Sequence, residues 1–199
     1  MEKQLIISIG REYGSGGHEI AEKLAEEFGL ELYDKNLLKQ VADEKSVNPS
    51  HLEKYDEVPR NLIFSRNVRG YSNSMEENVA NLQFEFIKKQ AQEGKSFVVV
   101  GRCAESILKD HPALISIFIL GDENNKIERI KKIYHLSTEE AKISIYRHDR
   151  KRKNYHNYYC KGKWGDSRNY DICVNSTKLG EEMTAKMLAK YIRKRMELW

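Results

Sequence analysis

The chain has 199 residues, of which 40% are apolar and 32% are charged, a composition that suits one domain with a sizeable core and excludes a disordered protein. Its 34 basic residues face 30 acidic ones, so the net charge of +4 argues against a nucleic-acid partner for the chain as a whole. No apolar run approaches the ~20 residues that a membrane-spanning helix needs, and the N-terminus runs into a predicted strand without a secretory signal. Three widely spaced cysteines fit neither a disulfide framework nor a zinc site. We therefore expect one cytoplasmic domain over residues 1–199, with no metal ligands of its own and no membrane partner.

The predicted elements alternate between strands and helices. Buried strands are predicted at Leu5–Ile9, Leu30–Tyr33, Phe97–Val100, Leu114–Leu120 and Tyr170–Val174, and helices at Gly17–Phe28, Asn36–Ala42 and Leu179–Trp199. This alternation predicts a parallel sheet that helices cover on both faces. Ligands of such sheets bind at the carboxyl ends of the strands, where Gly10, Asp34 and Gly101-Arg102 fall.

Two segments interrupt the alternation. Ser46–Lys95 is polar and helical in pattern, and the spacing of Leu82, Phe86 and Ala91 favours a final helix there. Lys151–Arg168 contains glycines and is predicted to be a loop or a mobile arm.

Positive charge is concentrated between Lys142 and Lys163, where eight lysines and arginines accompany a single acid, Asp149. Tyrosines are interleaved with these residues. Three interpretations remain open: a solvated helix face, a lid that grips phosphate, and a platform on which single-stranded nucleic acid stacks. Asp149 is expected to be an ion-pair partner of Arg147 or Arg152.

The turn after the first strand is rich in glycine and reads Gly10-Arg11-Glu12-Tyr13-Gly14-Ser15-Gly16-Gly17-His18. Glycines between a strand and a helix allow positive φ angles and a close approach to a ligand, while backbone N–H groups converge with the positive end of the helix dipole. This arrangement predicts a cradle for a phosphate chain. A tight turn that serves only helix–sheet packing is the alternative.

The turn departs from the phosphate-binding pattern GxxxxGK[ST] at its most informative positions. With Gly14-Ser15-Gly16 aligned on the end of the loop, Gly17 takes the place of the lysine and His18 the place of the magnesium-binding hydroxyl. Arg11 can supply the missing positive charge from the front of the loop, and Ser15 or His18 can contact the metal or a phosphate.

Four segments together resemble the cytidylate kinase-like family of small P-loop proteins: Ile7–Gly17, Leu32-Tyr33-Asp34-Lys35, Val99–Ala104 and Tyr155–Asn175. The resemblance implies a three-layer α/β P-loop fold with a parallel sheet, a helical acceptor-binding insertion over residues 46–95 and a basic lid over residues 142–168. It also implies ATP-dependent phosphoryl transfer, with Mg²⁺, to a small acceptor such as a nucleoside monophosphate.

The resemblance implies a role for each matching residue. The donor phosphates would bind to Gly10, Gly14, Ser15, Gly16 and Gly17, with His18 beside them. The acceptor would bind near Asp34 and Arg102, the latter matching the arginine of a Gly-Arg-Asp motif. The arginines Arg147 and Arg150 match positions in an arginine-rich lid and join Arg11 and Arg102 as candidate catalytic residues.

Several alternatives remain open. Without the lysine of the phosphate-binding pattern, the chain can be a catalytically weak nucleotide-binding or regulatory module. Asp34 fits a helix cap as well as an acceptor site, and His18 fits a surface residue of a first helical turn. Cys103, which stands where the Gly-Arg-Asp motif has its aspartate, is interpreted as a buried residue without a chemical role.

Overall fold

A five-stranded parallel sheet forms the centre of the molecule in a computed structural model that describes residues 3–34, 36–45, 54–56, 58, 67–68, 71–72 and 74–199. The strands lie in the order β2-β5-β1-β6-β7, and each neighbouring pair is parallel. They comprise β1 (Ile6–Arg11), β2 (Glu31–Tyr33), β5 (Phe97–Val100), β6 (Leu114–Leu120) and β7 (Ile172–Asn175). A separate antiparallel pair joins β3 (Asn67–Val68) to β4 (Tyr71–Ser72).

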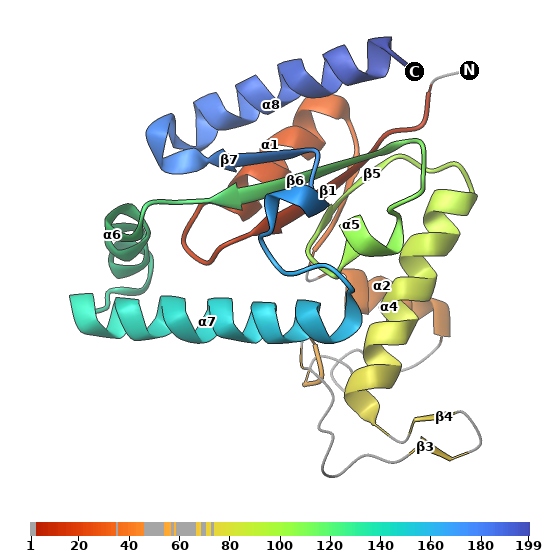
Figure 1. Ribbon diagram of the computed structural model, residues 1–199, viewed down its shortest axis with the longest axis horizontal. Helices are drawn as coiled ribbons and strands as arrows, with labels where there is room; N and C mark the ends of the chain where they lie inside the picture. The colour runs from red at the N-terminus through yellow and green to blue at the C-terminus, as the bar shows by residue number, and fades with distance from the viewer. Residues whose placement is uncertain are drawn as a thin grey trace.

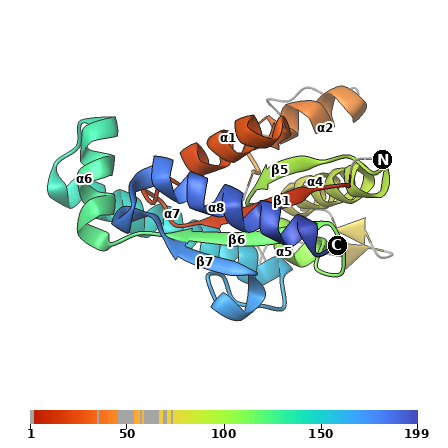
Figure 2. The same cartoon turned by 90° about the horizontal axis from the view of Figure 1, so that it is seen from above.

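Helices cover both faces of the sheet (Figure 1). One face packs against α1 (Gly17–Phe28) and α8 (Gly180–Glu197), and the other against α2 (Leu37–Lys45), α4 (Met75–Gln92) and α5 (Ala104–Ile107). The helices α6 (Glu123–Tyr134) and α7 (Thr138–Tyr159) pack against each other beyond the carboxyl end of β6. Figure 2 shows α8 lying along the sheet, above β1 and β6. The described part of the chain contains no helix long and apolar enough to cross a membrane.

The central strand explains why the sheet is buried on both sides. Ile7 and Ile9 point into one core, where they meet Leu24 of α1 and Leu188 of α8. Ile6 points into the opposite core with Phe97 and other residues of β5 and α4. Because neighbouring residues of a strand face opposite sides, a run that is apolar throughout requires cover on both. The predicted α/β fold with a parallel sheet is confirmed.

The segment Lys151–Arg168 is not the loop that we expected. The helix α7 continues to Tyr159, and only the residues after it form turns and a short 3₁₀ helix at Ser167–Asn169. Three features explain the difference. Ser137 and Glu140 form a capping box at the start of α7, and glycine and proline are absent from the helix. Its buried residues recur at helical spacing and hold it against the molecule; they are Ala141, Ile145, Tyr155 and His156.

The expected helical insertion at Ser46–Lys95 is described in part. Its final helix is α4, as the spacing of apolar residues predicted. Residues 46–53, 57, 59–66, 69–70 and 73 lie outside the described residues, so the acceptor-binding role of this insertion remains a prediction.

The packing of α8 on the sheet yields a test of the core. Leu188 is fully buried between α1 and the sheet. We expect Leu188→Ala to lower the free energy of unfolding by about 3 kcal/mol, because the substitution leaves a cavity that the surrounding side chains only partly fill. Urea denaturation measures the change. Leu198→Ala, at a side chain that is 76% exposed, is the control, and equal losses in the two variants would contradict this packing.

Candidate active site

The turn between β1 and α1 has a backbone path that only glycine follows easily. Gly14 and Gly16 have φ angles of +84° and +76°, in the left-handed region that other residues rarely adopt. A Cβ atom at Gly17 would lie 2.6 Å from the Cβ atom of Arg11, and one at Gly10 would lie 2.8 Å from the Phe118 ring. The glycines therefore bring the backbone closer to its surroundings than side chains would allow.

This path leaves backbone donors available. The amides of Glu12, Tyr13 and Ser15 donate to protein acceptors. Within the described ranges, the amides of Gly14, Gly16 and Gly17 have no protein acceptor. Gly17 begins α1, and the first N–H groups of a helix lack intrahelical partners and carry the positive end of its dipole. The turn thus offers convergent N–H groups to an anion.

Charged side chains hold the turn against α6 and α7. The Glu12 carboxylate accepts hydrogen bonds from the Gly121 amide at 3.1 Å and from the Lys126 ammonium at 2.8 Å. The Asp149 carboxylate of α7 accepts the Tyr13 amide at 2.6 Å and lies 3.9 Å from the Lys126 ammonium. Lys126 is only 8% exposed, so its charge serves these two carboxylates. Burial raises the pKa of Asp149, although the Tyr13 amide and Lys126 favour its charged form.

A cavity of about 410 Å³ opens beside the turn, at the carboxyl ends of β1, β2 and β5. Its wall combines the glycine turn with charged groups from five other segments and with apolar side chains of α6. The lining residues include Arg11, Gly14, Gly16, Gly17, His18, Glu19, Asp34, Asp56, Arg102, Arg129, Ile133, Tyr134, His148 and Arg152. Residues from widely separated parts of the chain therefore meet at the sheet edge where ligands of parallel sheets bind.

Arg102 lies on an unusual piece of backbone at this edge. Gly101, Arg102 and Cys103 have consecutive φ angles of +75°, +58° and +56°. Two successive non-glycine residues in this region carry strain, which the surrounding packing must hold in place. The Arg102 side chain is 4% exposed, and both of its terminal nitrogens lie 2.8 Å from the carboxylate oxygens of Asp56. Its guanidinium is thus oriented toward a two-oxygen anion, the geometry that also suits phosphate.

Asp34 and His18 lie together in the wall of the cavity. One carboxylate oxygen of Asp34 accepts the Asn36 amide at 3.0 Å in the turn that precedes α2, which begins at Leu37. The other oxygen lies 3.6 Å from Nε2 of His18. Both residues line the cavity, so capping and ligand binding do not exclude each other. The Ser15 hydroxyl, by contrast, is buried and donates to the Glu12 carbonyl at 2.9 Å, so the Ser15 side chain is committed to the turn itself.

The structure separates the candidate arginines into two groups. Arg11 and Arg102 line the cavity, but Arg147 and Arg150 are exposed on α7 and do not. The helical period explains why: Ile145, Asp149 and Arg152 lie on the inner face of α7, and Arg147 and Arg150 lie on the outer face.

Two arginines that the sequence analysis did not assign to the site line the cavity instead. Arg152 donates to the Arg11 carbonyl at 3.3 Å, and its guanidinium carbon lies 5.6 Å from the centre of the Tyr13 ring. Arg129 of α6 forms ion pairs with Glu19 and Glu181. The phase of the buried residues in α7 is a sequence signal that points to Arg152, whereas no motif marks Arg129.

The parallel sheet, the glycine turn and the helix that follows it define a P-loop kinase fold. The chain belongs to the cytidylate kinase-like family, whose model matches residues 6–178. It is 28% identical over 181 residues to the cytidylate kinase of Pyrococcus horikoshii. The aligned region covers 90% of this chain and 83% of that protein. An uncharacterized protein from Eubacterium ventriosum is similar in structure, with 41% identity, a TM-score of 0.76, and coverage of 96% of this chain and 99% of that one. Shikimate kinase from Bacteroides thetaiotaomicron shares the fold at 10% identity and a TM-score of 0.56, over 95% of this chain and 98% of its own.

The buried lysine beneath the turn provides a prediction. Lys126→Met removes the cation between Glu12 and Asp149 and leaves two partly buried carboxylates without it. We expect the free energy of unfolding to fall by about 2–4 kcal/mol, somewhat less than for a fully buried pair because Glu12 is partly exposed. Chemical denaturation measures this change. Lys132→Met, at an exposed position of the same helix, is the matched control, and a Lys126→Met variant as stable as that control would contradict the role of Lys126.

Proposed function

We propose that this protein transfers a phosphoryl group from ATP to a small anionic acceptor of the nucleoside monophosphate type. The observation that carries the proposal is that Gly14, Gly16 and Gly17, whose amides have no acceptor among the described residues, line the same cavity as Arg11 and Arg102. Family membership supports phosphoryl transfer in general, and the similarity to a cytidylate kinase supports a nucleotide acceptor.

The donor phosphates would bind to the turn, with Gly10 and Ser15 shaping its backbone and His18 at its edge. Phosphoryl transfer depends mainly on positioning and on neutralising charge as it develops. Arg11 stands at the front of the turn, and Arg129 and Arg152 line the same cavity. Together they would supply the charge that the lysine of the usual pattern supplies in other P-loop proteins.

The charges that line the cavity suit a phosphate ligand that binds together with a divalent cation. Four arginines and four carboxylates line it, so the wall is not simply positive. Asp34 and Glu19 are oxygen donors of the kind that Mg²⁺ takes, and they lie at the glycine-turn side. Mg²⁺ bound there with the nucleotide would reduce the negative charge of the donor phosphates.

The acceptor would bind between Asp34 and Arg102. In this structure the Arg102 guanidinium donates to the Asp56 carboxylate. The phosphate of the acceptor would displace that carboxylate and take its place on Arg102. The roles that the family resemblance gives to Arg147 and Arg150 require α7 to move, because both side chains lie on its outer face in this structure. A movement of that kind would also close the cavity and exclude water.

The experiment that tests the function is ADP formation from ATP and Mg²⁺ over a panel of nucleoside monophosphates and small alcohols. Acceptor-dependent, steady ADP formation is the expected result. Saturable ATP binding without ADP formation with any acceptor would contradict the proposal. It would favour the second candidate function, a nucleotide-binding regulatory module. The observation that favours this second function is Gly17, which stands where the usual pattern has its lysine.

The role of Arg11 yields a separate prediction. We expect Arg11→Ala to lower kcat about a hundredfold, with a smaller effect on the KM for ATP, because the charge matters most in the transition state. The measurement is steady-state kinetics with the best acceptor of the panel. Lys190→Ala, at an exposed position of α8, controls for loss of positive charge alone. Unchanged turnover in Arg11→Ala would remove Arg11 from the chemistry.

A further inference from the structure

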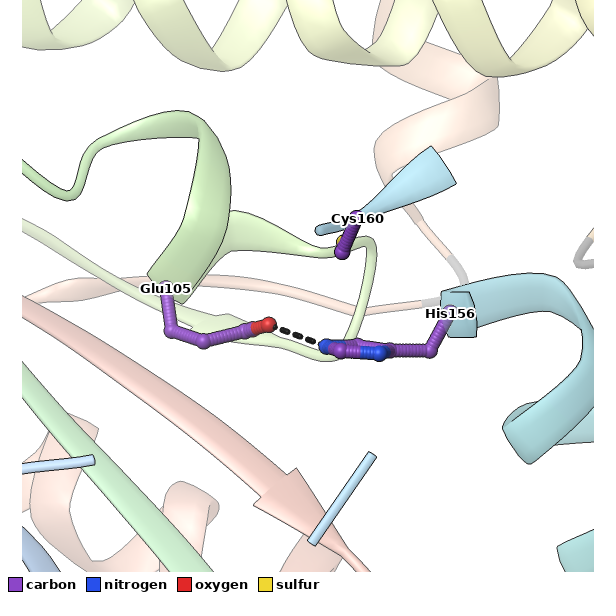
Figure 3. A group of neighbouring side chains, drawn as sticks. All are labelled: Glu105, His156 and Cys160. Atoms are coloured by element: carbon purple, nitrogen blue, oxygen red, sulfur yellow. Dashed lines mark hydrogen bonds and ion pairs between the residues drawn. The ribbon is translucent and has the colours of Figure 1, made fainter. Parts of the chain in front are cut away.

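A cluster of buried side chains with metal-binding chemistry lies behind the strained turn that holds Arg102. Figure 3 shows Glu105 of α5, His156 near the end of α7, and Cys160, the residue that ends α7. Nε2 of His156 lies 2.6 Å from a carboxylate oxygen of Glu105, and the three donor atoms lie within 4.8 Å of one another. The Cys103 thiol forms a hydrogen bond with the Cys160 thiol, so a further sulfur lies next to these three donors.

The four side chains are shielded from solvent. The exposed fractions are 4% for Cys103, 5% for Glu105, 5% for His156 and 9% for Cys160. Apolar and aromatic residues surround the cysteines, among them Ala80 and Tyr155. Cys103, Glu105 and His156 are among the residues that line a cavity of about 20 Å³, a volume that suits one water molecule or one ion.

Two short segments supply all four donors. Cys103 and Glu105 flank the start of α5, and the left-handed backbone at Arg102 and Cys103 turns the chain toward α7. His156 and Cys160 are four residues apart, the spacing that places two side chains on one face of a helix. The set therefore combines two thiols, an imidazole and a carboxylate, which are the ligand types that Zn²⁺ takes in closed four-coordinate sites.

We propose that Cys103, Glu105, His156 and Cys160 form a binding site for a divalent metal ion that takes sulfur and nitrogen ligands, such as Zn²⁺. In a tetrahedral site with the usual zinc bond lengths, donor atoms stand about 3.3–3.8 Å apart. The donor atoms of Glu105, His156 and Cys160 lie between 2.6 Å and 4.8 Å from one another, so an ion would separate Glu105 from His156 slightly. The Cys103 thiol would turn toward the ion from its hydrogen bond with Cys160.

The charges around the cluster are compatible with this ion. Two thiolates and one carboxylate around Zn²⁺ leave one net negative charge in the interior, which requires a compensating cation nearby. Arg11, Arg102 and Arg152 line the small cavity beside the cluster and carry positive charge.

Four protein ligands would make this a structural site, with no open position for a reacting water. The ion would tie the end of α7 to the strained turn that orients Arg102. It would therefore hold together two elements of the active-site wall, independently of whether the cavity binds a nucleotide.

Cobalt titration of the full-length, reduced, metal-free protein tests the site without nucleotide, so its outcome is separate from that of the kinase assay. We expect one equivalent of Co²⁺ to produce the visible bands of a tetrahedral site and a thiolate-to-cobalt charge-transfer band, and Zn²⁺ to abolish both. Cys160→Ser and His156→Ala should weaken cobalt binding at least a hundredfold, and Cys103→Ser at least tenfold. Cys173 lies outside the cluster, so Cys173→Ser should leave both bands unchanged.

Circular dichroism of each variant distinguishes a lost ligand from a lost fold, and only variants with the native spectrum are compared. Because Cys103→Ser retains a small polar side chain, it keeps the test decisive where His156→Ala does not fold. Absence of stoichiometric cobalt bands in the folded parent protein would overturn the proposal, and so would equal cobalt binding by the parent and Cys160→Ser. A Cys103–Cys160 disulfide that forms readily in a protein whose reduced form takes up no metal would also overturn it.

Discussion

The candidate site depends on the backbone conformation of the turn between β1 and α1, which leaves amide groups available to an anion. Positive φ angles at Gly14 and Gly16 turn the chain from β1 into α1, and the amides of Gly14, Gly16 and Gly17, which line the cavity, have no acceptor among the described residues. Such a turn would not hold its shape by itself, because glycine gains conformational freedom when it unfolds. Glu12, Lys126 and Asp149 supply the restraint by tying the turn to α6 and α7.

In the usual phosphate-binding loop, a lysine of the loop itself reaches the β- and γ-phosphates. Here the buried lysine, Lys126, comes from α6 and supports the loop from beneath. The charge available to a ligand comes from arginines that line the cavity, among them Arg11 and Arg152. A planar guanidinium can contact two phosphate oxygens at once, so arginines suit the wall of a phosphate cavity. The replacement of lysine by Gly17 is therefore compatible with an anion site, because charge reaches the cavity from other elements.

Much of the fold could be predicted from the sequence, whereas the site could be predicted only in outline. Periodicity located α1, β5 and β6 residue for residue, because buried strands and amphipathic helices leave direct patterns. The glycine turn and Arg102 were identified because each directly follows a strand. Arg129 and Lys126 were missed because they reach the site from α6, and only tertiary packing brings α6 there. The Glu105–His156–Cys160 cluster was missed for the same reason, since about 50 residues separate its two segments in the sequence.

The central claim is that the amides of the glycine turn bind the phosphates of a nucleotide. Its most direct test follows backbone amide chemical shifts in ¹⁵N-labelled protein during titration with a non-hydrolysable ATP analogue and Mg²⁺. The account predicts large, saturable shifts at Gly14, Gly16 and Gly17, with none at Gly94, a glycine of positive φ far from the cavity. Saturable binding of the analogue that leaves the three turn amides unshifted would contradict it.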